Sequence, residues 1–203
     1  MSIILIRHGE TELNTARVIQ HPETPLGARG IAQAKAVAQR ATSMKLTALL
    51  SSDMARAWMT AQAIGDATGL PIEPSQLLHE RNFGDLRGKA YDSLGFDPMT
   101  SDLIPGGESS TQFKQRVAQA FAMIVQRRQQ ADGPIAVVSH GLVIREIMDS
   151  HLHVPKSLTT PERLRNTSVT IFEADAPHRA SLLDCAQHLD AAIDDNGRSL
   201  SGA

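Results

Sequence analysis

The sequence predicts an α/β domain built around a mainly parallel β-sheet. Short apolar runs alternate along the chain with segments whose apolar residues recur at helical spacing. The chain has 203 residues, enough for one domain that buries a sizeable core. No repeat of 20 to 50 residues and no low-complexity linker is visible, so a second domain is not supported.

The first predicted strand covers residues 3–6, Ile-Ile-Leu-Ile. Four consecutive apolar residues are typical of a strand that is buried on both faces of a sheet. A helix is predicted over residues 28–41, because its apolar residues fall on one face. These residues are Ile31, Ala34, Ala38 and Ala41.

A second strand is predicted in the run LTALLSS, residues 46–52. Asp53 follows it and is a suitable N-cap for the next helix. That helix carries Ala57, Ala61 and Ile64 on its inner face. It is expected to end at Gly69. Residues 71–107 are rich in Gly, Pro, Asp and Ser, which predicts loops and short pieces that cover one edge of the domain.

The second half of the chain begins with a long predicted helix over residues 109–130. A second buried strand follows over residues 135–139, and a helix over 142–152. Residues 168–174 and 180–186 alternate enough to form two late strands, joined as a hairpin. The domain is expected to span residues 1–190, and the small polar tail 191–203 to be disordered.

Composition excludes several classes of function. The net charge is −2, too small to favour nucleic acid or an anionic membrane as a partner. The single cysteine rules out an internal disulfide framework and suits a reducing compartment. No apolar run is long enough for a signal peptide or a membrane span. We expect a cytoplasmic protein; its oligomeric state is left open, with a homodimer as one option.

In parallel α/β sheets, ligands bind beyond the carboxyl ends of the strands. Four basic side chains follow the predicted strands: Arg7, His8, Arg56 and His140. Guanidinium groups match the oxygens of phosphate or carboxylate. Gly9 and Gly141 are expected to let a bulky anion approach backbone N–H groups at a helix start. The sequence therefore predicts a site for a tetrahedral anion, with phosphate as the best candidate.

These residue types also suggest a reaction. A neutral imidazole can accept a phosphoryl group, and arginines neutralise the charge on the group in transfer. A metal site is disfavoured, because two arginines would repel a cation and no third ligand has suitable spacing. The acid that protonates the leaving group is not fixed by the residues alone. Glu80 is one candidate, and its rivals are Asp85, Glu10 and Glu108.

The motifs LIRHGETELN, TPLGARGIAQA, LLSSDMARAWMTAQAI, LHERNFGDLRG, PGGES and VVSHGLVIRE occur in this order along the chain. In this set and order the chain resembles the histidine phosphatase superfamily, whose fold is called phosphoglycerate mutase-like. The resemblance covers about residues 3–189. It implies a three-layer α/β/α sandwich around the mainly parallel sheet.

The resemblance also implies a role for each matching residue. His8 matches the nucleophile that becomes phosphorylated, and Glu80 matches the proton donor to the leaving group. The remaining matches hold the phosphoryl group: Arg7, Asn14, Arg56 and His140. Gly141 is added to the phosphate-binding set for its backbone N–H. Members of the family need no metal, and no cofactor is expected.

The chain departs from the family pattern in two places. Ile19-Gln20 replaces a Gln-Gly pair that relatives commonly carry, which changes the backbone near the substrate entrance. Leu86 and Arg87 replace a Trp-Glu pair, exchanging an aromatic and an acid for an aliphatic and a base at the mouth of the site. This second change either favours a more anionic substrate or is only structural.

The sequence thus predicts a phosphomonoester hydrolase that acts on a small phosphorylated metabolite through a phosphohistidine. One alternative is a phosphoglycerate mutase, which returns the phosphoryl group to a hydroxyl instead of to water. A further alternative, a non-catalytic phosphate-binding protein, would be expected to have degraded motifs, whereas here every matching position is intact.

Overall fold

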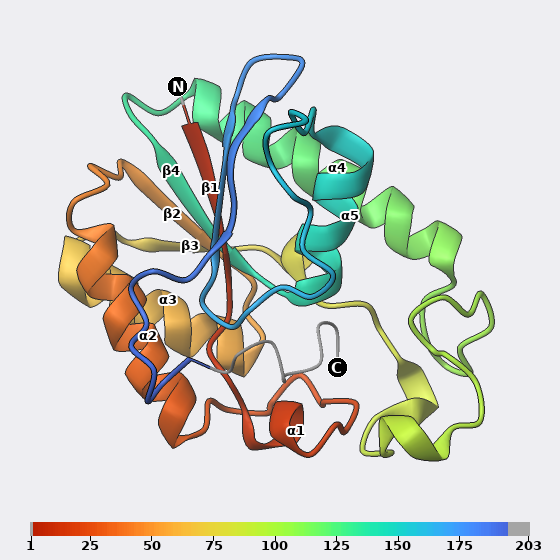
Figure 1. Cartoon of the computed structure of the whole chain (residues 1–203). Coiled ribbons are helices and arrows are strands. Elements are labelled where there is room, and N and C mark those ends of the chain that lie inside the picture. The colour runs from red at the N-terminus through yellow and green to blue at the C-terminus, as the bar shows by residue number, and fades with distance from the viewer. Residues whose placement is uncertain (1, 195–203) are drawn as a thin grey trace.

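The computed structural model describes residues 2–194, which fold around one six-stranded sheet (Figure 1). Its strands are β1 (Ser2–Arg7), β2 (Ala48–Ser51), β3 (Ile72–Pro74), β4 (Ile135–Ser139), β5 (Val169–Glu173) and β6 (Ala180–Cys185). They lie in the order β3-β2-β4-β1-β5-β6. The first four strands are parallel, and β5 and β6 add an antiparallel edge. The predicted mainly parallel sheet is confirmed.

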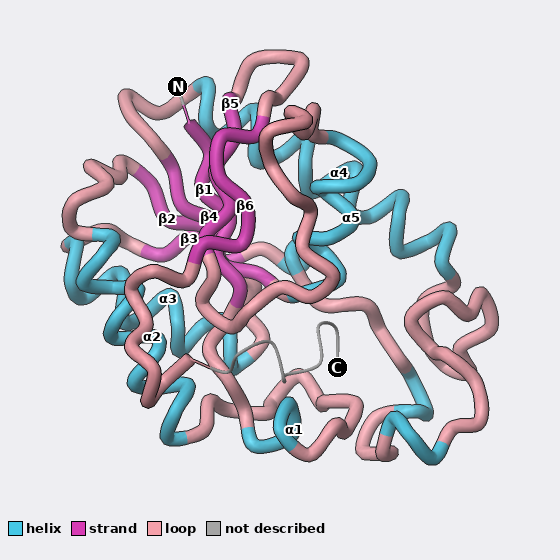
Figure 2. Tube along the Cα trace, viewed as in Figure 1, coloured by secondary structure: helices cyan, strands magenta, loops and turns pink. Residues whose placement is uncertain are grey.

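Helices cover both faces of this sheet, as Figure 2 shows. The helices are α1 (Glu12–Thr15), α2 (Ala28–Ala41), α3 (Ala55–Thr68), α4 (Ser110–Gln129) and α5 (Gly141–His151). One hydrophobic cluster joins α2 and α3 to the sheet, and a second joins α4 and α5 to the opposite face. The fold is therefore the three-layer α/β/α sandwich that the motifs imply.

The apolar run of β1 is explained by its central place in this sandwich. Ile3 and Leu5 belong to the cluster beneath α4 and α5, whereas Ile4 and Ile6 belong to the cluster beneath α2 and α3. All four side chains are buried. Because successive side chains of a strand point to opposite faces, a strand covered on both sides must be apolar at every position.

The sheet brings three strand ends to one edge. β4 lies between β1 and β2, with Arg7 opposite Ser139 and Ser51 opposite Val138. The residues that follow β1, β2 and β4 therefore meet at the carboxyl edge of the sheet, although they come from distant parts of the sequence.

The helix after β2 begins later than the sequence suggests. Its N-cap is Met54, which makes no side-chain capping bond. The prediction of Asp53 as N-cap was therefore wrong, since its carboxylate contacts the His79 ring instead. Gly69 ends the helix in the left-handed conformation, with φ of 74°, as predicted.

The irregular stretch 71–107 consists of loops, the short strand β3 and three 3₁₀ turns, in agreement with the prediction. Most of the predicted tail, residues 195–203, lies outside the described residues. Residues 191–194 are described and make contacts. Gln33 donates to the Ile193 carbonyl at 2.7 Å, and Arg165 lies 3.7 Å from the Asp194 carboxylate.

Within residues 2–194, no helix is both long and apolar enough to cross a membrane.

Candidate active site

The sheet register brings His8 and His140 together at the strand ends. The backbone N–H of His8 donates to the Ser139 carbonyl at 3.0 Å, which continues the pairing of β1 with β4 by one residue. The two imidazole rings lie 5.2 Å apart between centroids, with their planes inclined by 57°. Both side chains are buried. The two similar motifs of the sequence thus meet in one site.

His8 is held as a neutral imidazole with a defined proton position. Its Nδ1 lies 2.7 Å from the Gly9 carbonyl oxygen, and since a carbonyl can only accept, Nδ1 carries the proton. Burial lowers the pKa of His8 well below its usual range, and the charges of Arg56 and Arg7 lower it further. The lone pair of Nε2 is therefore the nucleophilic position of this ring.

Two buried guanidinium groups flank the imidazoles. Arg7 ends β1 and donates to the Leu164 carbonyl at 2.5 Å. Arg56, in the first turn of α3, donates to the His21 carbonyl at 3.1 Å. Burial lowers the pKa of Arg56 to about 10, with a further contribution from Arg7. Even so the group remains charged at neutral pH, and two cations held this close favour an anionic ligand.

His140 is the N-cap of α5 and is tied to the residue that follows β2. Its Nε2 lies 2.8 Å from the Ser52 hydroxyl, which accepts from the Met54 N–H. Nδ1 has no hydrogen-bond partner among the described residues, and it carries the ring proton in the tautomer in which Ser52 donates to Nε2. Burial lowers the pKa of His140 well below its usual range, and the charge of Arg56 adds to this effect. The ring can thus donate Nδ1–H to a bound anion.

Glu80 is the carboxyl group that the structure brings to this site. It is buried, with Oε1 accepting the Arg81 N–H at 3.0 Å and Oε2 accepting the Leu142 N–H at 3.2 Å. Burial raises the pKa of Glu80, and these two N–H groups and the charges of Arg56 and Arg7 only partly oppose the rise. A carboxyl group of this kind can keep its proton at higher pH than an exposed one and deliver it as an acid.

The rival carboxylates are otherwise engaged or exposed. Glu10 lies 3.2 Å from the Arg29 guanidinium, and Glu108 is paired with Arg116 at 2.7 Å. Asp85 is exposed. The geometry therefore supports the assignment of Glu80 that the family motifs imply.

Two arginines fix the segment that carries Glu80. The Arg81 guanidinium does not pair with Glu80 but donates to four backbone carbonyls, those of Pro98, Met99, Ser101 and Glu108. Arg116, on α4, donates to the carbonyls of Leu77, His79 and Glu80. Irregular backbone would otherwise leave these acceptors unpaired at the edge of the core. The rigid placement of Glu80 thus depends on residues outside its own motif.

The structure refines the roles that the sequence suggested for Gly9, Gly141 and Asn14. Gly9 does not offer its N–H to a ligand, because this group donates to the Thr60 hydroxyl at 3.0 Å. Its small size is needed for packing instead, since a Cβ there would lie 2.6 Å from the Gly30 carbonyl oxygen. Gly141 does lie in the first turn of α5. Asn14 is buried, and its Oδ1 caps α1 by accepting from Thr11, so only its Nδ2 is suited to an anion.

Sequence reasoning missed three residues that position the site. Ser52 orients His140 as described above. Asn166 donates from Nδ2 to the His8 carbonyl at 2.9 Å, and Thr60 accepts the Gly9 N–H. Ser52 and Thr60 lie within the quoted motif LLSSDMARAWMTAQAI, whereas Asn166 lies just before the late predicted strand over residues 168–174.

A cavity of about 290 Å³ reaches Glu80 from the surface. Its lining includes Glu80, Asn82, Arg87 and Arg116. The expectation that Leu86 and Arg87 both lie at the mouth is half correct. Leu86 is buried in a separate hydrophobic cluster with Ile19, Phe83 and Ile104, so its role is structural.

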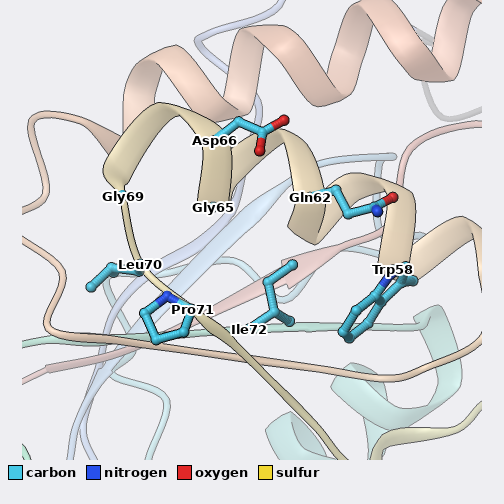
Figure 3. A pocket seen from close by; sticks show the side chains of 8 residues that line it. All are labelled: Trp58, Gln62, Gly65, Asp66, Gly69, Leu70, Pro71 and Ile72. Carbon is cyan, nitrogen blue, oxygen red and sulfur yellow. The ribbon is translucent and has the colours of Figure 1, made fainter.

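A larger cavity of about 690 Å³ lies elsewhere, along α3 and the start of β3 (Figure 3). Trp58 projects from the helix on the side where Ile72 lies. None of the predicted site residues lines this groove. Size alone therefore does not identify the site; the convergence of buried cations, imidazoles and a carboxyl group does.

Among residues 2–194, no group of three or more His, Cys, Asp or Glu side chains is arranged to hold a metal ion.

A neutral imidazole with guanidinium groups and a buried carboxyl group near it, at the strand ends of such a sandwich, has the chemistry that phosphoryl transfer needs. The profile of the histidine phosphatase superfamily (branch 1) matches residues 3–184, and the chain belongs to this family.

Individual relatives carry different functional names. The probable phosphoglycerate mutase GpmB of Salmonella choleraesuis (strain SC-B67) is 35% identical over 181 residues, covering 84% of this chain and 83% of that protein. A mycobacterial glucosyl-3-phosphoglycerate phosphatase, solved with VO3, is 26% identical with a TM-score of 0.72, covering 85% of this chain and 90% of the other. YhfR of Bacillus stearothermophilus is 26% identical with a TM-score of 0.75, covering 95% and 98%.

Proposed function

We propose that the protein is a phosphomonoester hydrolase that acts on a small phosphorylated metabolite through a phosphohistidine intermediate. The observation that carries the proposal is that one buried site holds an imidazole with a lowered pKa, His8, and a carboxyl group with a raised pKa, Glu80. Burial lowers the pKa of His8, which favours the neutral nucleophile, and burial raises the pKa of Glu80, which favours the protonated acid.

In the first step, Arg7, Arg56 and His140 hold the phosphoryl group. Nε2 of His8 attacks the phosphorus, and the bond to the ester oxygen breaks. The ester oxygen receives the proton of Glu80 and leaves as an alcohol. The guanidinium groups stabilise the charge on the three equatorial oxygens during this transfer.

In the second step, the Glu80 carboxylate takes a proton from a water molecule whose oxygen attacks the phosphorus. The bond between phosphorus and Nε2 breaks, inorganic phosphate leaves, and neutral His8 and protonated Glu80 are restored. The two steps use one carboxyl group first as acid and then as base.

The cavity supports transfer to water over transfer to a second hydroxyl. Its rim includes Arg87 and His79, both partly exposed, and it leads to the buried Glu80. Water thus has a route to the group that would activate it. The irregular segment 71–107, which carries Glu80, packs on Ile19 through its own small hydrophobic cluster of Phe83, Leu86 and Ile104.

The mutase alternative has the curated GpmB name in its favour. Incubation with 3-phosphoglycerate and a bisphosphoglycerate primer decides between the two reactions. We expect phosphate release to exceed isomerisation. Isomerisation far faster than phosphate release would assign the chain to the mutases.

The covalent intermediate has a direct test. We expect a radiolabelled phosphoryl group to be trapped on the wild-type chain by rapid quenching, and to be absent from His8→Ala. His153→Ala, which removes an exposed imidazole, is the matched control and should label normally. Normal labelling of His8→Ala would overturn the mechanism, and no labelling of any variant, without turnover, would favour the non-catalytic alternative. A phosphate-release screen over a panel of metabolites would then name the substrate class.

A further inference from the structure

The cavity that reaches Glu80 contains one cation whose charge the protein leaves uncompensated. Arg87 lines this cavity and is partly buried. Within residues 2–194 its guanidinium makes no hydrogen bond or ion pair, and only its backbone N–H is engaged, with the Gly84 carbonyl. A guanidinium that lines a cavity without a protein partner is available to bind an anionic ligand.

The other charged groups around the cavity are satisfied by the protein. Arg116 binds the Glu108 carboxylate through two nitrogens, at 2.7 and 2.8 Å. His79 contacts Asp53. Glu80 accepts from two backbone N–H groups, and burial raises its pKa. Among the described residues, Arg87 is therefore the charged side chain of this lining that has no protein partner.

A second donor lines the same cavity as Arg87. Asn82 lines the cavity, and its Oδ1 accepts the Gly84 N–H at 2.9 Å. This bond fixes the orientation of the carboxamide and leaves Nδ2 as the donor that faces other partners. A guanidinium fork and an amide donor together suit a carboxylate or phosphate oxygen.

The position of Arg87 relative to the reaction follows from its neighbours. Glu80, which would protonate the leaving oxygen, lines the same cavity. The Arg87 charge also lowers the pKa of Arg56, so the two guanidinium groups lie within electrostatic range of each other. A group at Arg87 would therefore belong to the leaving alcohol and not to the transferred phosphoryl group.

We propose that Arg87 is a specificity-determining residue that binds a second anionic group on the leaving alcohol. The substrate class is then a small phosphomonoester whose alcohol carries a carboxylate or a second phosphate. This inference rests on the proposed function of the same site. The cavity volume of about 290 Å³ suits a short carbon chain.

The test compares matched leaving groups. Phosphoglycolate and ethylene glycol bisphosphate carry the second anion as a carboxylate and as a phosphate, ethyl phosphate carries none, and phosphoethanolamine carries a cation. For the wild type we expect kcat/KM to be highest for one of the two anionic esters and lowest for phosphoethanolamine. The preferred anionic ester identifies the group that Arg87 binds.

Arg87→Gln should lower the ratio of kcat/KM for the preferred anionic ester to that for ethyl phosphate by roughly tenfold to a hundredfold, mostly through KM, because one charge-assisted contact is lost. Arg87→Lys should recover part of this ratio. Lys89→Gln removes an exposed cation from the same segment and should leave the ratio unchanged. An unchanged ratio in Arg87→Gln, or the same loss with Lys89→Gln, would overturn the inference.

A binding experiment separates this inference from the hydrolytic mechanism. Calorimetry with phosphonoacetate and with ethylphosphonate, neither of which can be hydrolysed, should show preference for phosphonoacetate in the wild type and not in Arg87→Gln. If no ester releases phosphate but this preference holds, the hydrolase proposal fails and the anion subsite stands. If esters are hydrolysed without any anionic preference, the subsite fails and the hydrolase proposal stands.

Discussion

The Glu80 carboxyl group is tied to Leu142, whose backbone N–H donates to Oε2 at 3.2 Å. Leu142 lies in the first turn of α5, directly after His140 and Gly141. The acid from the irregular covering segment is thereby fixed against the same helix start that carries the second histidine. The contact links two parts of the chain that are far apart in sequence, and it fixes the proposed acid although it lies on a loop.

The first prediction concerns leaving groups. Glu80→Gln should slow the hydrolysis of alkyl phosphates by about 10²–10⁴, the usual contribution of general acid catalysis. Aryl phosphates should lose far less, because a phenolate leaves without a proton. Steady-state kcat values for both ester types check this. Asp85→Asn, which changes an exposed carboxylate, is the control. Equal losses on both ester types would show that Glu80 is not the acid.

The second prediction concerns the pH dependence of the same step. Burial raises the pKa of Glu80, and the reaction of alkyl esters needs the protonated form. Activity should therefore be present below this raised pKa and fall as the pH rises through it. In Glu80→Gln the residual activity should lose this alkaline limb. Profiles of kcat measured for wild type and variant provide the comparison, and a limb that persists in the variant would assign it to another group.

The third prediction concerns stability at low pH. Burial lowers the pKa values of His8 and His140, whereas the unfolded chain binds protons near pH 6.5. The stability that neutral burial provides is present above pH 6.5 and is lost as the pH falls below it, by up to about 1.4 kcal/mol per pH unit for each imidazole. The raised pKa of Glu80 acts in the opposite direction: its contribution to the free energy of unfolding decreases as the pH rises above the pKa that Glu80 has in the unfolded chain.

Urea unfolding between pH 5 and pH 8 measures this loss. His8→Gln should show a shallower decrease in the free energy of unfolding than the wild type. His153→Gln, at an exposed site, should follow the wild-type slope more closely. A slope that does not change in His8→Gln would mean that this imidazole is protonated in the folded state.

The fourth prediction concerns the packing of the loop after β1 on α2. A Cβ at Gly30 would lie 1.9 Å from the Glu10 carbonyl oxygen. Gly30→Ala must therefore displace the backbone near His8, with an expected cost of about 1–3 kcal/mol and a loss of activity. Thermal unfolding and turnover of this variant are compared with those of Gly95→Ala. At Gly95 φ is +70°, and an added Cβ would have no atom within 4 Å. Gly95→Ala should therefore lose stability only through backbone strain.

The fifth prediction concerns the Ser52 contact with His140. Ser52→Ala removes the hydroxyl that faces Nε2 and should weaken inhibition by inorganic phosphate by about fivefold, as expected for one hydrogen bond of about 1 kcal/mol. The imidazole signals of His140 in NMR spectra should shift as well, which a merely structural role elsewhere would not cause. Ser75→Ala, whose hydroxyl contacts Met123, is the control. Unchanged signals in Ser52→Ala would remove Ser52 from the site.

Local sequence patterns predicted most of the fold. The helix over residues 28–41 has the expected bounds, and the strand over 135–139 does as well. These elements were predictable because hydrophobic periodicity and glycine or proline stops act over short stretches. Asp53 shows the limit, since its carboxylate is drawn to His79, a partner outside the helix that it was expected to cap.

The sequence by itself determined the fold class, the family and the candidate site residues, because strand ends carry ligands and because the motifs match the family in order. Only the tertiary structure decided their protonation and their partners. The proximity of His8 and His140 results from the pairing of β1 with β4, a contact between distant segments that no local pattern encodes. The same holds for Arg87, which lies on the cavity of Glu80, and for Leu86, which is buried away from it. Leu86 and Arg87 are adjacent in the sequence but have different environments, because burial and electrostatics depend on what the folded chain places around each side chain.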